Sequence, residues 1–151
     1  MYYYYYSRFL NPGDLPEVKR LCNEWFPIEY PDQWYADITS THKFYSVAAV
    51  YRGQIVGMVV AEIKDADTLP KEDSQILARA FGSSGSKIGY ILSLGVVKEF
   101  RKQGIASFLL ENLIAHLTSP GKNLNFVCIF KTVVGTMYDF HDSTDIFGQI
   151  L

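Results

Sequence analysis

The chain has 151 residues, 48% hydrophobic and 15% aromatic, a composition that favours one globular domain and argues against general disorder. Its formal net charge of −2 gives no overall attraction to nucleic acids or acidic membranes, so any anion site has to be local. The two cysteines, Cys22 and Cys128, make no disulfide framework and lack the spacing of metal ligands, which favours reduced thiols.

The N-terminal third predicts a strand followed by two helices. Tyr2–Leu10 is rich in aromatic residues and favours a strand, which the turn signal Asn11–Asp14 closes; Tyr2–Tyr6 would equally suit a frayed chain end. Apolar residues at helical spacing predict a helix over Leu15–Trp25, and a proline-rich segment ends it. A short helix is predicted over Trp34–Ile38. We expect neither a signal peptide at the N-terminus nor a membrane-spanning run anywhere in the sequence.

The centre of the sequence predicts a hairpin. Phe44–Tyr51 and Gln54–Lys64 are two strand-like runs, and Arg52-Gly53 joins them. Both runs are almost continuously apolar, so we expect burial on both faces of the sheet. The polar segment Asp65–Lys87 is predicted to be a solvated connection with a helix over Pro70–Phe81.

A strand and a helix are predicted next, over Tyr90–Val97 and Ile105–Leu117. The helix is expected to turn five apolar side chains inward: Ile105, Phe108, Leu109, Leu113 and Leu117. After a proline-glycine break, Leu124–Val134 favours one further strand, and 135–151 has no clear period.

The segment Val97–Ala106 between that strand and helix is typical of a site for a diphosphate. Gly104 permits a positive φ and close approach of a ligand to the backbone. The backbone N–H groups from Gln103 to Ala106 point out of the helix end, and two cations, Arg101 and Lys102, lie beside them. The same residues would also suit an ordinary helix N-terminus with a solvated basic turn.

Arg101-Lys102-Gln103-Gly104-Ile105-Ala106 resembles the loop that GNAT acetyltransferases use to hold the pyrophosphate of acetyl-CoA. Three longer segments are similar to the Golgi-associated NatF-type N-alpha-acetyltransferases of that family: Trp25–Pro31, Tyr51–Lys64 and Tyr90–Arg101. The resemblance implies an α/β (α+β) GNAT fold, in which a mixed, mainly antiparallel sheet has flanking helices. It covers roughly residues 8–117.

The resemblance also implies roles for individual residues. Tyr90 matches the family's catalytic tyrosine. The residues implied to bind the cofactor are Leu92, Leu94, Arg101, Lys102, Gln103, Gly104, Ile105 and Ala106. The residues implied to bind the substrate are Phe26, Pro27, Glu29 and Tyr30. The family needs acetyl-CoA as co-substrate and no metal.

The similarity to the NatF-type pattern ends in the last quarter of the chain. A strand with a catalytic histidine would come next, but Cys128 or Ile129 falls at the histidine position. We therefore expect a partial GNAT domain over 1–118 and a divergent tail over 119–151, with the C-terminal third of the fold missing or replaced. Such a chain would be a truncated or alternatively spliced form.

The sequence leaves three functions open. The first is acetyl transfer to protein N-termini that begin with Met followed by a hydrophobic or Lys residue, and also to histone lysines. The second is an inactive truncated isoform that at most binds CoA or partner chains. The third, nucleic-acid binding through Lys98, Arg101 and Lys102, is disfavoured because three basic residues release few counterions. The expected location is the cytoplasm or the cytosolic face of the Golgi membrane, although the family's membrane-binding segment has no counterpart here.

Overall fold

The computed structural model describes residues 4–40, 42–68, 71, 75, 87–117 and 128–130, with the backbone alone at 66, 87–88 and 128–130. The described elements are, in chain order, β1 (Tyr6–Phe9), the 3₁₀ helix η1 (Pro12–Asp14), α1 (Leu15–Trp25), α2 (Asp32–Ser40), β2 (Tyr45–Tyr51), β3 (Gln54–Asp65), η2 (Ala66–Thr68), β4 (Lys87–Val96), η3 (Lys98–Phe100), α4 (Ile105–Leu117) and β5 (Cys128–Phe130).

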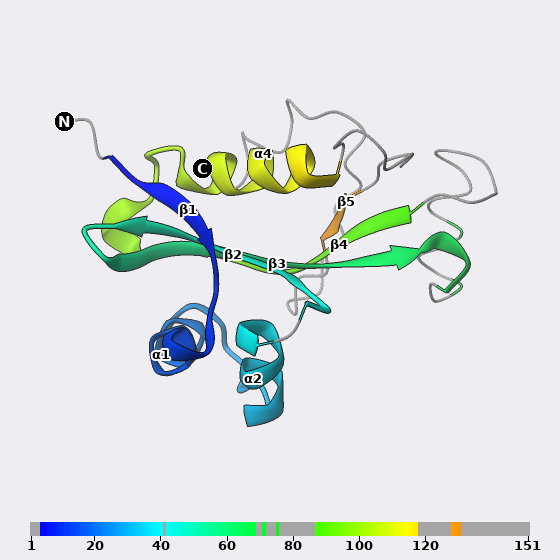
Figure 1. The fold of residues 1–151 in the computed structure, drawn as a ribbon, viewed down its shortest axis with the longest axis horizontal. Helices are drawn as coiled ribbons and strands as arrows, with labels where there is room; N and C mark the ends of the chain where they lie inside the picture. Colours follow the sequence, from blue (N-terminus) through cyan, green and yellow to red (C-terminus); the bar gives the residue numbers. More distant parts are fainter. Residues whose placement is uncertain are drawn as a thin grey trace.

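These strands form one sheet in the order β1-β2-β3-β4-β5. Neighbours from β1 to β4 run antiparallel, and β5 runs parallel to β4. Helix α4 covers one face of the sheet, and α1 and α2 cover the other (Figure 1). The predicted fold class, a mixed and mainly antiparallel sheet with flanking helices, is confirmed.

The predicted hairpin forms between β2 and β3. Arg52 and Gly53 have φ values of 49° and 79°, so both central residues of the turn are left-handed. Such turns match the right-handed twist of the strands that they join. The hairpin is anchored to α1 by a hydrogen bond of 3.3 Å from the backbone N–H of Ile55 to Glu17 Oε1.

Burial on both faces of the central strands is also confirmed. The cluster beneath α4 consists of Tyr45, Val47, Ala49, Val56, Val59, Ala61, Ile91, Ile105, Leu109, Leu110, Leu113 and Leu117. The cluster beneath α1 and α2 consists of Leu10, Val18, Leu21, Cys22, Tyr35, Ile38, Ala48, Val50, Ile55, Met58 and Val60. Apolar surface buried on two faces of one sheet supplies most of the free energy that holds the layers together.

The helices agree closely with their predicted bounds, with one extension. Leu15–Trp25 and Ile105–Leu117 are helical over their whole predicted lengths. Four of the five predicted inward residues of α4 are buried, and Phe108 is half-buried. Helix α2 is longer than Trp34–Ile38, since it begins at Asp32, whose acidic side chain suits a helix N-terminus and pairs with Lys19 of α1.

Several predictions extend beyond the described residues. Of the helix predicted over Pro70–Phe81 the structure describes Lys71 and Gln75, which are both helical, and of the strand over Leu124–Val134 it describes Cys128–Phe130; the segment 135–151 lies outside the described residues. Within residues 4–10, the described part of the predicted N-terminal strand, pairing with β2 covers Tyr6–Phe9, so the strand is shorter there than predicted.

We expect stability to fall in acid through Asp14. Its carboxylate accepts two hydrogen bonds from Arg8, at 2.7 and 2.8 Å, and one of 2.9 Å from the backbone N–H of Asn11. These bonds, above all those from Arg8, lower the pKa of Asp14. A carboxyl whose pKa is lower in the folded state stabilises the fold above its unfolded pKa of about 4, and this contribution is lost as the pH falls through the folded pKa.

Asp14→Asn is therefore expected to lower the free energy of unfolding by about 1–2 kcal/mol at pH 7 and by much less near pH 3. Urea unfolding at both pH values measures the difference. Asp67→Asn, at an exposed carboxyl, is the control. Equal stability of Asp14→Asn and the unmodified chain at pH 7 would contradict the prediction.

Cys22 is expected to resist alkylation in the folded chain. Its side chain has an exposed fraction of 0%, and burial raises the pKa of the thiol to about 12. Because the thiolate is the nucleophile, iodoacetamide at pH 8 should leave Cys22 unmodified until urea unfolds the chain. Peptide mass spectrometry gives the modified fraction, with N-acetylcysteine as the reference. Modification of folded protein at the reference rate would show that this prediction is wrong.

Candidate functional site

Strand β4 carries an irregularity at the centre of the predicted site. Its register against β3 shifts, with Val60 opposite Ser93 and Ala61 opposite Ile91, so Leu92 is an extra residue. A bulge of this kind changes the face to which the following side chains point. Ile91 and Leu94 consequently both pack toward the α4 face, whereas Leu92 packs toward the α1 face.

The same strand loses its second neighbour just there. Within the described residues, β4 pairs with β5 at three positions, Gly89 to Ile91, whereas it pairs with β3 as far as Val96. In the part of the chain that the structure describes, the β4 edge from Leu92 onward therefore has no strand beside it. Backbone N–H and C=O groups at such an edge are available to a ligand.

The loop after β4 is fixed by its own hydrogen bonds. Arg101 Nε donates to the Val96 carbonyl at 3.0 Å, and Gln103 Nε2 donates to the Glu99 carbonyl at 3.3 Å. Lys102 has a φ of 61°, a strained value for a residue with a side chain, and Gly104 has a φ of 80°. The expectation that Gly104 supplies a left-handed backbone is confirmed.

The N-terminus of α4 presents free amide groups at this loop. The first intrahelical bond runs from the Phe108 N–H to the Gly104 carbonyl at 2.9 Å, so the preceding amides of Ile105 and Ala106 have no acceptor inside the helix. The helix end comes close to the sheet at Gly57, where a Cβ atom would lie 2.9 Å from Ile105 Cγ2. Partial positive charge and two cations, Arg101 and Lys102, thus meet at one place.

The predicted substrate residues lie in the connection from α1 to α2, a chain of aromatic contacts. Phe26 is edge-on to Tyr30 at 6.3 Å between ring centroids, and Tyr30 stacks on Trp34 at 4.1 Å. Burial is the main cause that raises the pKa of Tyr30. Pro27 and Glu29 are exposed. The connection therefore offers an apolar aromatic surface with one carboxylate at its edge.

A cavity of about 250 Å³ is lined both by residues predicted to bind the cofactor and by one predicted to bind the substrate. The predicted residues that line it are Phe26, Leu94, Arg101, Lys102, Ile105 and Ala106. The remaining predicted residues lie outside its lining: Pro27, Glu29, Tyr30, Tyr90, Leu92, Gln103 and Gly104. The cavity has basic groups and helix amides at one end and apolar side chains at the other, an arrangement suited to a ligand with an anionic part and an apolar part.

Tyr90 lies farther along β4. It is opposite Glu62 of β3 and Ile129 of β5, and its side chain is 5% exposed. Lys64 Nζ lies 5.4 Å from the centre of its ring. Leu94 lies four positions beyond Tyr90, which corresponds to about 13 Å along the backbone.

The structure adds four cavity residues to those predicted: Trp25, Gly95, Val96 and Phe100. Gly95 had a signal in the sequence, because a glycine inside a strand pattern often marks a place where another group approaches the backbone closely. Trp25 had none, since a tryptophan at the end of an amphipathic helix is usual in a core. The partner of Gly95 becomes visible only when α1 is placed beneath the sheet.

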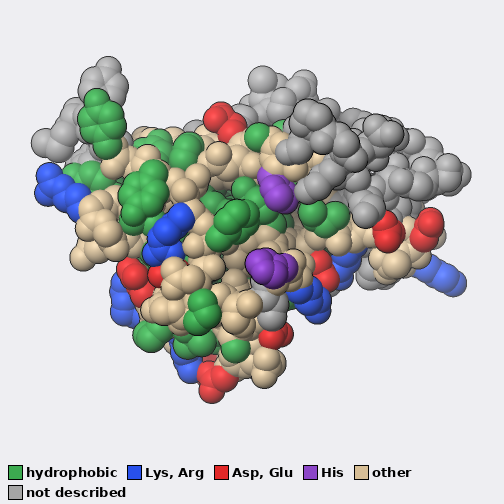
Figure 2. All heavy atoms as spheres, viewed as in Figure 1, with side chains coloured by type: hydrophobic (Ala, Val, Ile, Leu, Met, Phe, Trp, Pro, Cys, Tyr) green, Lys and Arg blue, Asp and Glu red, His purple; other side chains and the backbone are tan. Residues whose placement is uncertain are grey.

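A second cavity, of about 570 Å³, lies between the start of β2 and the ends of α2 and α4. Its lining includes His42, Ser46 and His116 and none of the predicted site residues. Figure 2 shows both described histidines on one face of the molecule. The candidate site is the smaller cavity, because the N-terminal residues of α4 line it together with Leu94 of β4, whose edge has no neighbouring strand among the described residues.

The described residues offer neither a metal site nor a membrane-spanning helix. They contain no cluster of three or more His, Cys, Asp or Glu side chains placed to hold a metal ion. They also include no helix with the length and apolar character that crossing a bilayer requires.

Residues 15–134 match the acetyltransferase (GNAT) family. N-alpha-acetyltransferase 60 of Xenopus tropicalis is 60% identical over 116 residues, which cover 77% of this chain and 48% of that protein. The Drosophila melanogaster protein of the same name is 47% identical and is covered to 49%. The chain thus spans about half the length of these curated relatives.

Two crystal structures of NAA60 from Arabidopsis thaliana are similar to the fold. The complex with acetyl-CoA has a TM-score of 0.67 at 28% identity, covering 84% of this chain and 73% of that one. The complex with a bisubstrate analogue has a TM-score of 0.73 at 23% identity, covering 95% and 79%. Together with the family match over most of its length, these similarities show that the chain belongs to the GNAT acetyltransferase family.

Proposed function

We propose that this chain binds acetyl-CoA and transfers its acetyl group to the α-amino group of protein N-termini. The observation that carries the proposal is the cavity that joins the loop before α4 to Leu94 and Phe26. Membership of the GNAT family and the similarity to N-alpha-acetyltransferase 60 support the same activity.

The residues present fit the anionic part of acetyl-CoA. The amides of Ile105 and Ala106 point out of α4 without intrahelical acceptors, and Arg101 and Lys102 line the same cavity. Helix N-termini with nearby cations bind phosphate groups well. The glycine at 104 leaves open space for a close approach, since a Cβ there would meet only the Tyr5 hydroxyl, at 4.0 Å.

The apolar end of the cavity fits the acyl arm. Leu94 and Phe26 line it, and the β4 edge from Leu92 onward has no strand beside it among the described residues. Backbone groups of Leu92 and Leu94 would hold the arm by hydrogen bonds, as an additional strand would be held. Amides at this edge would also stabilise the oxyanion that forms when an amine attacks a thioester carbonyl.

Acetyl transfer requires an unprotonated amine. An N-terminal ammonium has a pKa of about 8 and must lose a proton before the attack. We assign the removal of this proton to Tyr90, whose phenolate oxygen would accept it directly or through water; the amide bond then forms as the thioester C–S bond breaks and CoA leaves as its thiolate. Because Tyr90 lies about four strand positions from the cavity lining, a water relay is the preferred route.

The proposed substrates are chains that begin with Met followed by a hydrophobic or Lys residue. The aromatic rings of Phe26 and Tyr30 would pack on the Met side chain, and exposed Glu29 would attract the ammonium group of a Lys. Histone lysines are a further proposed substrate. We propose that the chain acts in the cytoplasm or at the cytosolic face of the Golgi membrane.

Binding without transfer is the second candidate. The residue opposite Tyr90 on β5 is Ile129, so this strand position offers no side chain that can take a proton. A chain of this kind would bind acetyl-CoA in the same cavity and leave it unchanged.

One experiment separates the two candidates. The chain is incubated with acetyl-CoA and a Met-Leu peptide, and mass spectrometry detects acetylation of the α-amino group; an N-terminally blocked lysine peptide tests transfer to lysine. Calorimetry measures acetyl-CoA binding in parallel. Acetylated product above the uncatalysed background supports the enzyme, and binding without product supports the second candidate.

Tyr90→Phe is expected to lower kcat for the Met-Leu peptide by about 10²-fold or more, because it removes the only oxygen of the proposed base. The dissociation constant of acetyl-CoA should stay unchanged, since Tyr90 lies outside the cavity lining. Tyr45→Phe is the matched control, at another buried tyrosine of the sheet. If Tyr90→Phe retains full kcat, Tyr90 is not the base.

Gly104→Ala is expected to weaken acetyl-CoA binding about fivefold or more, because a side chain at positive φ costs roughly 1–2 kcal/mol and distorts the loop. Gly53→Ala provides the control, because Gly53 has nearly the same φ, 79° against 80°, in the β2–β3 turn. Both variants should melt at lower temperature, but only Gly104→Ala should raise the dissociation constant in calorimetry. Equal affinities of the two variants would argue against the loop as the binding site.

A further inference from the structure

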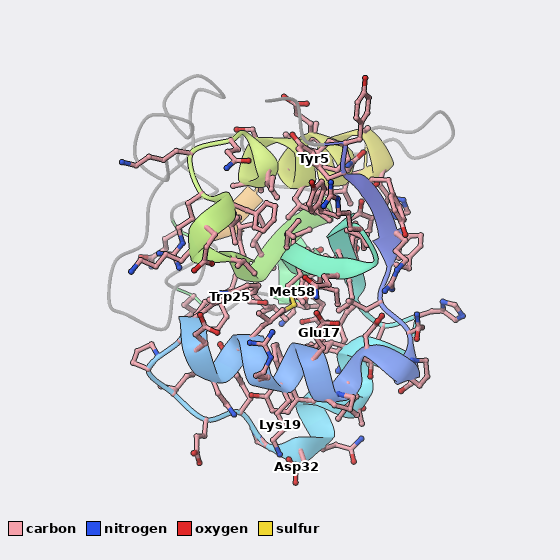
Figure 3. All side chains as sticks on the ribbon, turned by 90° about the vertical axis from the view of Figure 1, so that its left-hand side faces the viewer. Tyr5, Glu17, Lys19, Trp25, Asp32 and Met58 are labelled. Atoms are coloured by element: carbon pink, nitrogen blue, oxygen red, sulfur yellow. The ribbon has the colours of Figure 1, made fainter. Side chains whose placement is uncertain are left out.

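The indole ring of Trp25 lies directly on the backbone of Gly95. A Cβ atom built on Gly95 would lie 2.2 Å from Trp25 Cε3, 2.7 Å from Cζ3 and 2.8 Å from Cδ2. These are ring atoms rather than the end of a flexible chain, so any side chain at position 95 would displace the ring. Figure 3 shows Trp25 at the end of α1, between the helix and the sheet.

Packing rather than hydrogen bonding holds this ring. Trp25 Nε1 is buried and has no hydrogen-bond partner among the described residues. Its nearest aromatic neighbour is Phe26, edge-on at 6.3 Å. The surface on which the ring rests is therefore the bare backbone of β4, and the glycine at position 95 makes that contact possible.

The contact is placed where it can set the position of the substrate loop. Trp25 is the last residue of α1, and Phe26 leaves the helix with extended φ and ψ of −119° and 139°. Phe26 then contacts Tyr30, which stacks on Trp34 of α2. The segment 26–30 thus starts at a point fixed on β4 and ends on α2, and Trp25, Phe26 and Gly95 all line the cavity.

We infer that Trp25 is a positioning residue, which holds the substrate-binding segment 26–30 at a set distance from β4 through its contact with Gly95. The inference rests on the proposed function. In a transferase, the attacking amine and the acyl group must be held within a few tenths of an ångström of the productive geometry. Here the contact of the Trp25 ring with Gly95 sets the distance between segment 26–30, which would bind the peptide, and the edge of β4, which would bind the acyl arm.

The contact itself is tested by a double-mutant cycle on stability. Gly95→Ala should lower the melting temperature strongly in the unmodified chain, because the new methyl group overlaps the indole. In the Trp25→Leu background the same change should have little effect, since the smaller side chain leaves room. If Gly95→Ala lowered the melting temperature equally in the unmodified chain and in Trp25→Leu, the contact would be contradicted.

Kinetics then test the positioning role. Gly95→Ala and Trp25→Leu should each raise KM for the Met-Leu peptide by about tenfold, a larger change than either makes in the dissociation constant of acetyl-CoA, whose proposed cavity both residues line. The double variant should be no worse than Trp25→Leu alone. A change in acetyl-CoA affinity with an unaltered peptide KM would make Trp25 a cofactor contact and overturn the inference.

Gly57→Ala is a matched variant at the opposite face of the same part of the sheet. Its Cβ would lie 2.9 Å from Ile105 Cγ2, so it displaces the N-terminus of α4 instead of the end of α1. It should weaken acetyl-CoA binding and leave the peptide KM unchanged, the reverse of Gly95→Ala. If Gly57→Ala and Gly95→Ala changed the peptide KM and the acetyl-CoA dissociation constant in the same way, both would be loosening the sheet in general, and the inference would be contradicted.

Failure of the proposed function can be recognised separately. If the unmodified chain forms no acetylated peptide, the proposed transfer is refuted, and hydrogen exchange then decides the positioning role. Amides of segment 26–30 should gain more in exchange rate in Gly95→Ala, relative to the unmodified chain, than those of β2 and β3. Equal exchange in segment 26–30 would overturn the inference.

Discussion

Two glycines on adjacent strands determine how closely the layers of this protein can meet. Gly57 of β3 faces the first residue of α4, and Gly95 of β4 faces the last residue of α1. Each absent side chain lets an element approach the sheet to a distance that alanine would prevent. The cavity lies where these approaches coincide, so its shape depends on two positions that contribute no side chain of their own.

The charge of the site is local and partly made of backbone. The chain as a whole has a net charge of −2, yet the loop before α4 combines two cations with amides that have no intrahelical acceptor. The left-handed conformations of Lys102 and Gly104 determine the direction in which this loop enters α4. Strain of this kind is tolerated where the surrounding hydrogen bonds determine the backbone, and the bonds of Arg101 and Gln103 to nearby carbonyls do so here.

Much of the fold follows from local patterns in the sequence. The bounds of α1 and α4 and the Arg52-Gly53 hairpin could be predicted because periodicity and turn chemistry are encoded within a few residues. The bulge at Leu92 could not, because a register shift depends on the partner strand. The pairing of Trp25 with Gly95 likewise joins residues seventy positions apart, which no local pattern reveals. The roles of Tyr90, Gln103 and Glu29 came from family resemblance and stay predictions.

The parallel pairing of β5 with β4 has a consequence for folding. The antiparallel partners β2 and β3 are joined by a short turn, whereas β5 can reach its parallel partner β4 only after α4 has crossed the sheet. Contacts that depend on such crossovers close large loops and form late. A ligand that bridges β4 and β5 would bind only the fully assembled sheet. Raising its concentration would therefore shift the folding equilibrium from partly folded chains toward chains in which β5 is paired with β4.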